Sequence, residues 1–197
     1  MVDRFLEQGF TYFDTSYVYH GGMSESALKE ALVDRHPRDS FTITTKLPLF
    51  MVKEKADVRP FFQEQLTRLG TDYVDYYWLH AVNAATYETA KQTDAFSELI
   101  ALKAEGLTRH IGLSFHDSAE VLDRILTEHP EMEYVQLQLN YYDWESSSVQ
   151  ARKCYETVVK HGKQVVVMEP VKGGSLAKLP EELEQLYRNE QPNLSIA

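Results

Sequence analysis

Gln164-Val165-Val166-Val167-Met168 is a short run of β-branched residues in which apolar and polar positions do not alternate. Such a continuous pattern is typical of a parallel strand that is covered on both faces. Runs of this kind recur about every 25 to 35 residues, which is the length of one β-loop-α-loop unit. They end near Asp14, Lys46, His80, Phe115, Asn140 and Pro170. Strand followed by helix, six times over, predicts a parallel α/β sheet.

Segments with helical spacing of apolar residues separate these runs. The predicted helices cover residues 24–32, 57–69, 93–105, 121–129, 146–161 and 181–189. Residues 81–91, directly after His80, are predicted to be a loop that shapes a pocket. The pattern favours a (β/α) barrel of the TIM type, although an open doubly wound sheet is also compatible with it.

The number of units predicts an incomplete barrel. A closed eight-stranded barrel usually needs about 250 residues, whereas this chain has 197 residues and six strand-like runs. The chain opens inside an amphipathic helix, and Leu194-Ser195-Ile196-Ala197 is predicted to begin another one. We therefore expect a single domain over residues 1–197 with about six of eight units, lacking the first strand and the C-terminal units.

Composition excludes several classes of partner. The net charge of −10 disfavours nucleic acid and anionic membrane surfaces, since both would repel the chain. The single cysteine, Cys154, cannot form an intramolecular disulfide, which fits a reducing compartment. The sequence contains neither a signal peptide nor an apolar run long enough for a membrane span. These features predict a cytoplasmic protein.

Reactive side chains follow three of the predicted strands. Asp14, Tyr19, Lys46 and His80 come at or just after strand ends, the edge where α/β barrels build active sites. Taken singly, such residues have structural explanations: Asp14 could cap a turn, Tyr19 could be a core aromatic, and a lone lysine is usually a surface residue. An acid, a phenol, an amine and an imidazole at one edge together indicate proton chemistry on a bound substrate.

The motifs around these residues resemble those of the aldo-keto reductase family. Four segments carry the resemblance, in the family's order: Phe13-Asp14-Thr15-Ser16-Tyr17-Val18-Tyr19 with Gly21, Gly22 and Ser24-Glu25, then Thr44-Thr45-Lys46, Val74-Asp75-Tyr76-Tyr77-Trp78-Leu79-His80, and Ile111-Gly112-Leu113-Ser114. Because they span most of the chain, the match is specific. It implies a TIM-type barrel and reduction of an aldehyde or ketone with NAD(P)H.

Two further segments, residues 110–117 and 168–174, resemble one branch of that family. This branch is the iron–sulfur-associated bacterial aldo-keto reductases, whose cluster cysteines lie in a C-terminal extension. Because Cys154 is the only cysteine here, we expect no iron–sulfur cluster and no other metal site in this chain.

The resemblance assigns a role to each catalytic candidate. A phenol has a pKa near 10 and is a weak acid at neutral pH, and a nearby ammonium lowers that value. Lys46 is the expected ammonium, and Asp14 would keep it charged and oriented. Tyr19 would then donate a proton to a carbonyl oxygen that His80 also binds. The hydride must come from a cofactor.

The resemblance also implies residues that bind NADP or NAD. Ser114 and Gln136 would bind the nicotinamide carboxamide. Met168 stands where many members have a tyrosine that stacks on the ring, and a thioether can take that place, although a plain core methionine is nearly as well supported. Gly173 and Gly174 could cradle the pyrophosphate, although such a pair is more often a turn. By the resemblance, the region that selects between the two cofactors follows the eighth strand, and we expect it to lie outside these 197 residues.

Two alternatives to an active reductase for small carbonyl substrates remain open. A catalytically impaired, truncated barrel could act as a binding or assembly protein, because open strand edges invite pairing, including self-association. The sequence could also be a fragment of a longer gene product.

Overall fold

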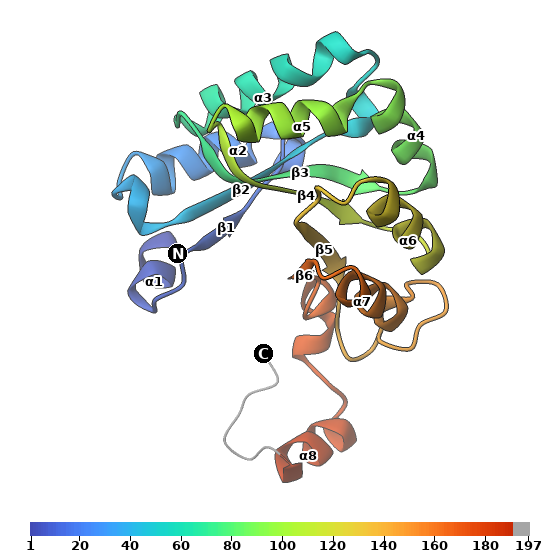
Figure 1. The fold of residues 1–197 in the computed structure, drawn as a ribbon. Coiled ribbons are helices and arrows are strands. Elements are labelled where there is room, and N and C mark those ends of the chain that lie inside the picture. Colours follow the sequence, from blue (N-terminus) through green and yellow to red (C-terminus); the bar gives the residue numbers. More distant parts are fainter. Residues whose placement is uncertain (191–197) are drawn as a thin grey trace.

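The computed structural model describes residues 1–190 and contains one sheet of six parallel strands in the order β1-β2-β3-β4-β5-β6 (Figure 1). The strands are β1 (Tyr12–Asp14), β2 (Thr42–Leu47), β3 (Val74–Val82), β4 (Thr108–Phe115), β5 (Tyr134–Gln138) and β6 (Gln164–Met168). Each strand pairs in parallel with the next one along the chain. All carboxyl ends therefore lie at one edge of the sheet, which we call the C-terminal rim.

The helices that connect successive strands cover the outer face of the curled sheet, whereas the first helix precedes β1 and the last one follows β6 and projects away from the sheet (Figure 1). The helices are α1 (Val2–Glu7), α2 (Ser24–Leu28), α3 (Lys55–Leu69), α4 (Ala84–Gln92), α5 (Ala95–Ala104), α6 (Ala119–Glu128), α7 (Ala151–Lys160) and α8 (Glu181–Glu190). A π-helical turn, η2 (Lys29–Val33), continues α2. Two short 3-10 segments, η1 (Tyr19–Gly22) and η5 (Lys172–Ala177), follow β1 and β6 at the C-terminal rim.

The strand order decides between the two predicted architectures. A doubly wound sheet reverses its strand order at a switch point, whereas these six strands follow one another without a reversal. The sheet curls into a half-barrel with its helices outside (Figure 1). The prediction of an α/β fold of TIM-barrel type with six strands is confirmed.

The core lies between the sheet and the helices that cover it. Ile43, Leu79 and Leu113 of the central strands are fully buried, and they face Phe62 of α3 and Leu99 of α5 within one apolar cluster. Burying side chains of this size contributes roughly 1.5–3 kcal/mol each. This layer fixes the positions of the strand ends that carry the site.

The strand run 164–168 differs from its prediction in one respect. It is a parallel strand, but it is not covered on both faces, because Val167 is 50% exposed. Among the described residues β6 pairs only with β5, so it is an end strand of the sheet. The continuous apolar pattern therefore predicted the strand and its parallel direction correctly. The predicted burial of both faces was wrong.

The segment after His80 is also different from the prediction. Residues 81–91 are not a loop, because β3 continues to Val82 and α4 begins at Ala84. The Asn83 side chain caps this helix by accepting hydrogen bonds from the backbone N–H groups of Ala85 and Thr86, at 2.9 and 3.0 Å. Small and polar residues on its outer side hid the helix in the sequence.

The remaining predicted helices agree with the structure to within a few residues, except that the one predicted over 146–161 begins only at Ala151. The helix expected at 194–197 lies outside the described residues. No helix within residues 1–190 is both long enough and apolar enough to cross a membrane.

Candidate active site

Lys46 and Asp14 meet at the C-terminal rim, at the ends of the first two strands. Lys46 lies near the end of β2 with 0% of its surface exposed, and its Nζ donates to Oδ1 of Asp14 at the end of β1. The same amine donates to the carbonyl oxygen of Thr15 at 2.9 Å. A buried ammonium is tolerated only with such partners. Lys46 is thus held by the strand next to its own.

Tyr19 lies against this pair. The Nζ of Lys46 is 4.9 Å from the centroid of the Tyr19 ring, and 37% of Tyr19 remains exposed. Burial and the negative charges of Asp14 and Glu169 raise the pKa of Tyr19 to about 12. The prediction that Lys46 lowers this pKa is therefore wrong here, because burial and these two negative charges act in the opposite direction and outweigh the nearby ammonium. Tyr19 keeps its proton at neutral pH.

His80 completes the group from β3. Its ring centroid is 5.6 Å from that of Tyr19, and its Nδ1 lies 3.0 Å from the Ser16 hydroxyl oxygen. Burial, together with the positive charge of Lys46, lowers the pKa of His80 to about 4, so the imidazole is neutral at pH 7. If Ser16 donates to Nδ1, Nε2 carries the hydrogen and can donate to a ligand.

Replacing His80 with Asn is expected to remove part of the acid sensitivity of the fold. The folded-state pKa of about 4 lies below the ordinary 6.5, so between these values only the unfolded chain binds the proton. Stability is therefore lost as pH falls through this window, by roughly 2 kcal/mol near pH 5. Urea unfolding near pH 7.5 and near pH 5 measures this loss, and an equal loss in wild type and His80→Asn would contradict it.

Two of the predicted cofactor residues lie next to this group. Ser114 of β4 and Gln136 of β5 are partners in strand register, and both side chains are buried. The Ser114 hydroxyl oxygen accepts a hydrogen bond from the Ala81 N–H at 2.9 Å. The Gln136 amide donates to Oδ2 of Asp14 at 3.0 Å. These two contacts use neither the Ser114 hydroxyl hydrogen nor the Gln136 carbonyl oxygen.

The other predicted cofactor residues lie on the next strand and the segment after it. Met168 is the last residue of β6 and is half-buried. Gly173 and Gly174 of η5 have positive φ angles of 62° and 94°, and a Cβ at either position would have no atom within 4 Å. There is therefore open space beside both glycines, although the Gly174 N–H already donates to the Val171 carbonyl at 2.9 Å.

Sequence reasoning missed Asp143, which ties two rim loops together. Its carboxylate accepts from the Lys172 amine at 2.6 and 2.7 Å and from the Gln138 and Asn140 amides, each at 2.9 Å. These donors lower the pKa of Asp143 to about 2. The contacts connect the loop after β5 to η5. In the sequence, the one signal for this connection was that Asn140 and Asp143 lie close together just after a predicted strand.

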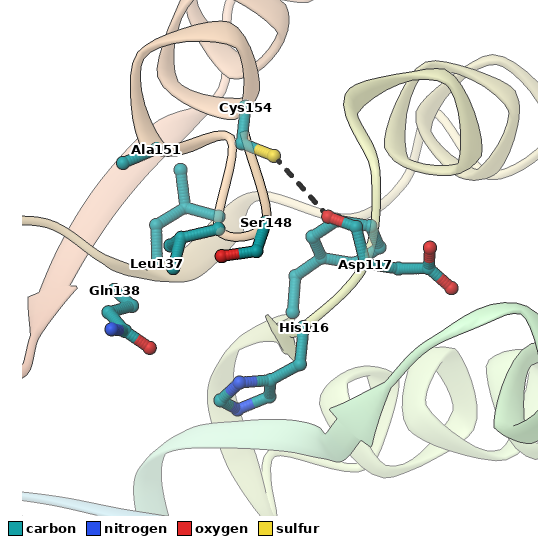
Figure 2. Close-up of a pocket in the computed structure, with 9 residues that line it drawn as sticks. His116, Asp117, Leu137, Gln138, Ser148, Ala151 and Cys154 are labelled. Atoms are coloured by element: carbon teal, nitrogen blue, oxygen red, sulfur yellow. Dashed lines mark hydrogen bonds between the residues drawn. The ribbon is translucent and has the colours of Figure 1, made fainter. Parts of the chain in front are cut away.

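A cavity of ≈ 140 Å³ lies beside the site, between the ends of β4 and β5 and the start of α7 (Figure 2). None of the predicted site residues lines it. The Cys154 thiol at its wall donates to the Asp117 carbonyl at 3.7 Å, and burial raises the pKa of this thiol to about 11. Cys154 is thus a protonated thiol at neutral pH and not an activated nucleophile.

Comparison with known proteins explains the motifs that converge at the rim. The family model described as "Aldo/keto reductase family" matches residues 1–195. This chain belongs to the aldo/keto reductase family. The match covers every residue discussed at the site.

Individual relatives of this aldo/keto reductase chain include both characterised and uncharacterised proteins. "Uncharacterized oxidoreductase YqkF" of Bacillus subtilis is 31% identical over 58% of this chain and 38% of its own length. "Methylglyoxal reductase DkgB" of Salmonella typhi is 34% identical over 57% of this chain and 40% of its own length. The matched segments thus span about two fifths of these relatives.

Solved structures agree with the fold of this aldo/keto reductase chain. The crystal structure of an aldo/keto reductase from Brucella melitensis has a TM-score of 0.75 and 24% identity, over 99% of this chain and 69% of that protein. The similarity supports the half-barrel architecture described above.

Proposed function

We propose that this aldo/keto reductase chain reduces an aldehyde or ketone with hydride from NAD(P)H, with Tyr19 as the general acid. The observation that carries the proposal is the meeting of Asp14, Lys46 and His80 around Tyr19 at one rim. The name of the Salmonella typhi relative, a methylglyoxal reductase, favours a small carbonyl compound as the substrate.

Three side chains of this protein would each have a separate role in the reduction. His80, neutral at pH 7, would donate from Nε2 to the carbonyl oxygen and fix its direction. Tyr19 retains its proton and, being partly exposed, can present its hydroxyl to the same oxygen. Lys46, held by Asp14, would stabilise the negative charge that develops on the phenol as the proton leaves.

Five residues fit the binding of NADP or NAD, which supplies hydride when bound. Ser114 and Gln136 each keep one hydrogen-bonding group free, a donor and an acceptor that match a carboxamide. Met168 would lie against the ring, and the turn at Gly173 and Gly174, which has open space beside both residues, would take the pyrophosphate.

A titration of the full chain with NADPH, and separately with NADH, tests this proposal. We expect saturable changes in nicotinamide fluorescence and loss of nicotinamide absorbance when methylglyoxal is added. The ratio of the two affinities would also identify the preferred cofactor. Absence of both binding and turnover would contradict the proposed function.

Two finer assignments are proposed from the sequence alone. Membership of the iron–sulfur-associated branch is proposed from residues 110–117 and 168–174. A cytoplasmic location is proposed from the composition and the single cysteine, Cys154.

A second candidate function is assembly through the ends of the sheet. Within the described residues, β1 and β6 each pair with one strand only, and Val167 on β6 is half exposed. Unpaired strand edges template further pairing. A dimer by light scattering, together with no response to NADPH, would favour assembly over reduction.

A further inference from the structure

The Asp14 carboxylate is bound on both of its oxygens. Oδ1 accepts from the Lys46 amine. Oδ2 accepts from the Gln136 amide at 3.0 Å and from the Tyr12 hydroxyl at 3.3 Å. A carboxylate with donors on both oxygens has little freedom to rotate, and charge-assisted hydrogen bonds of this kind are stronger than neutral ones.

The two donors to Oδ2 are themselves fixed in orientation. The Tyr12 oxygen accepts from the Thr44 hydroxyl at 2.9 Å, which leaves the Tyr12 hydrogen for Asp14. An ionised carboxylate can only accept, so Gln136 must turn its NH₂ group toward Asp14. Gln136 comes from β5, 122 residues along the chain from Asp14. The contact therefore ties the first strand of the half-barrel to the fifth.

We propose that Gln136 and Tyr12 are positioning residues for carbonyl reduction, because they hold the outer oxygen of Asp14 so that the inner oxygen stays on Lys46. This inference rests on the proposed function for its catalytic meaning. It adds to the carboxamide role of Gln136, since the amide nitrogen serves Asp14 while the carbonyl oxygen remains free. Tyr12 has no role in the motif resemblance.

The orientation of Asp14 should affect the charge of Lys46. Its amine faces Asp14 from β1, Tyr19 from η1 and His80 from β3. Burial lowers the pKa of Lys46, and among these groups only Asp14 raises it. If Asp14 is free to turn away, the pKa of Lys46 should fall further.

Gln136→Met tests the proposal by removing the amide while keeping the length of the side chain. The matched control is Gln138→Met on the same strand, whose amide donates to Asp143 at 2.9 Å instead of to Asp14. In the full chain labelled with ¹³C-lysine, the Lys46 signal is identified by its loss in Lys46→Arg and titrated by NMR. We expect its midpoint to fall by about one pH unit in Gln136→Met and to stay unchanged in Gln138→Met.

The Lys46 titration in Tyr12→Phe is a second, independent test. It is sufficient by itself if Gln136→Met does not fold. A fall of the Lys46 midpoint in Tyr12→Phe supports the proposal. An unchanged midpoint in Tyr12→Phe and in any folded Gln136→Met overturns it, as does an equal fall in Gln138→Met.

Turnover separates this inference from the proposed function. In an active chain, we expect kcat to fall about tenfold in Gln136→Met and in Tyr12→Phe, with a shifted pH profile and little change in the KM for the carbonyl compound. The NMR titration needs no turnover. If the wild-type chain reduces no carbonyl compound, the proposed function fails, while the titration still tests the hold of Gln136 and Tyr12 on Asp14.

Discussion

Replacing Tyr19 with Phe is expected to lower carbonyl reduction by roughly a hundredfold to ten-thousandfold, the range over which a positioned acid acts. The change removes only the hydroxyl group, and the ring that lies against Lys46 is kept. Nucleotide binding should be nearly intact, because the groups proposed to hold the cofactor are elsewhere. Steady-state turnover of methylglyoxal and nicotinamide fluorescence measure the two effects separately.

Tyr17→Phe is the matched control, since this tyrosine lies in the same segment. Its hydroxyl donates to Glu64 at 3.0 Å on the exposed side of the molecule. We expect its loss to leave turnover unchanged. Tyr19→Phe with wild-type turnover would rule out Tyr19 as the acid, and an equal loss in both variants would indicate a general disturbance of the segment.

Replacing Gly112 with Ala is expected to have the largest effect on stability. A Cβ at this position in β4 would lie 2.2 Å from the Tyr134 carbonyl oxygen and 2.9 Å from the Trp78 ring. Backbone of the adjacent strand cannot move away as a side chain could, so the cost should be about 3 kcal/mol or more. The urea midpoint should fall with no change in the slope of the transition.

Gly106→Ala separates steric conflict from the intrinsic cost of losing a glycine. Gly106 has a φ of +78°, and a Cβ there would have no atom within 4 Å. Only backbone strain of about 1 kcal/mol is expected from this change. A Gly112→Ala variant no less stable than Gly106→Ala would mean that β4 and β5 can separate more easily than their packing implies.

The strands were predictable because each is a short, largely apolar run, and three of these runs carry a reactive polar group at or near the strand end. Lys46 and His80 belong to such runs, at the ends of β2 and within β3. Helix α4 was not predictable, since its apolar contacts come from Tyr87 and Ala90 alone among small and polar residues. Asn83 could be recognised as the N-cap of this helix only from the structure, in which its side chain accepts a hydrogen bond from the Ala85 N–H.

The contacts of the candidate site were only partly predictable. The motif resemblance implied that Asp14 holds Lys46, and the structure has this contact. The sequence did not indicate that Gln136 reaches the same carboxylate from β5. Nor did it indicate the raised pKa of Tyr19, since burial and the neighbouring charges of Asp14 and Glu169 depend on the packed structure.

The sequence by itself determined the order of strands and helices and the type of side chain at each strand end, because local hydrophobic pattern and chain chemistry set both. The tertiary structure decided that β6 is half exposed at the end of the sheet, that Tyr19 holds its proton, and that Gln136 shares Asp14 with Lys46. Burial, charge and hydrogen bonding of this kind arise between segments distant in sequence, and they exist only when the sheet has curled.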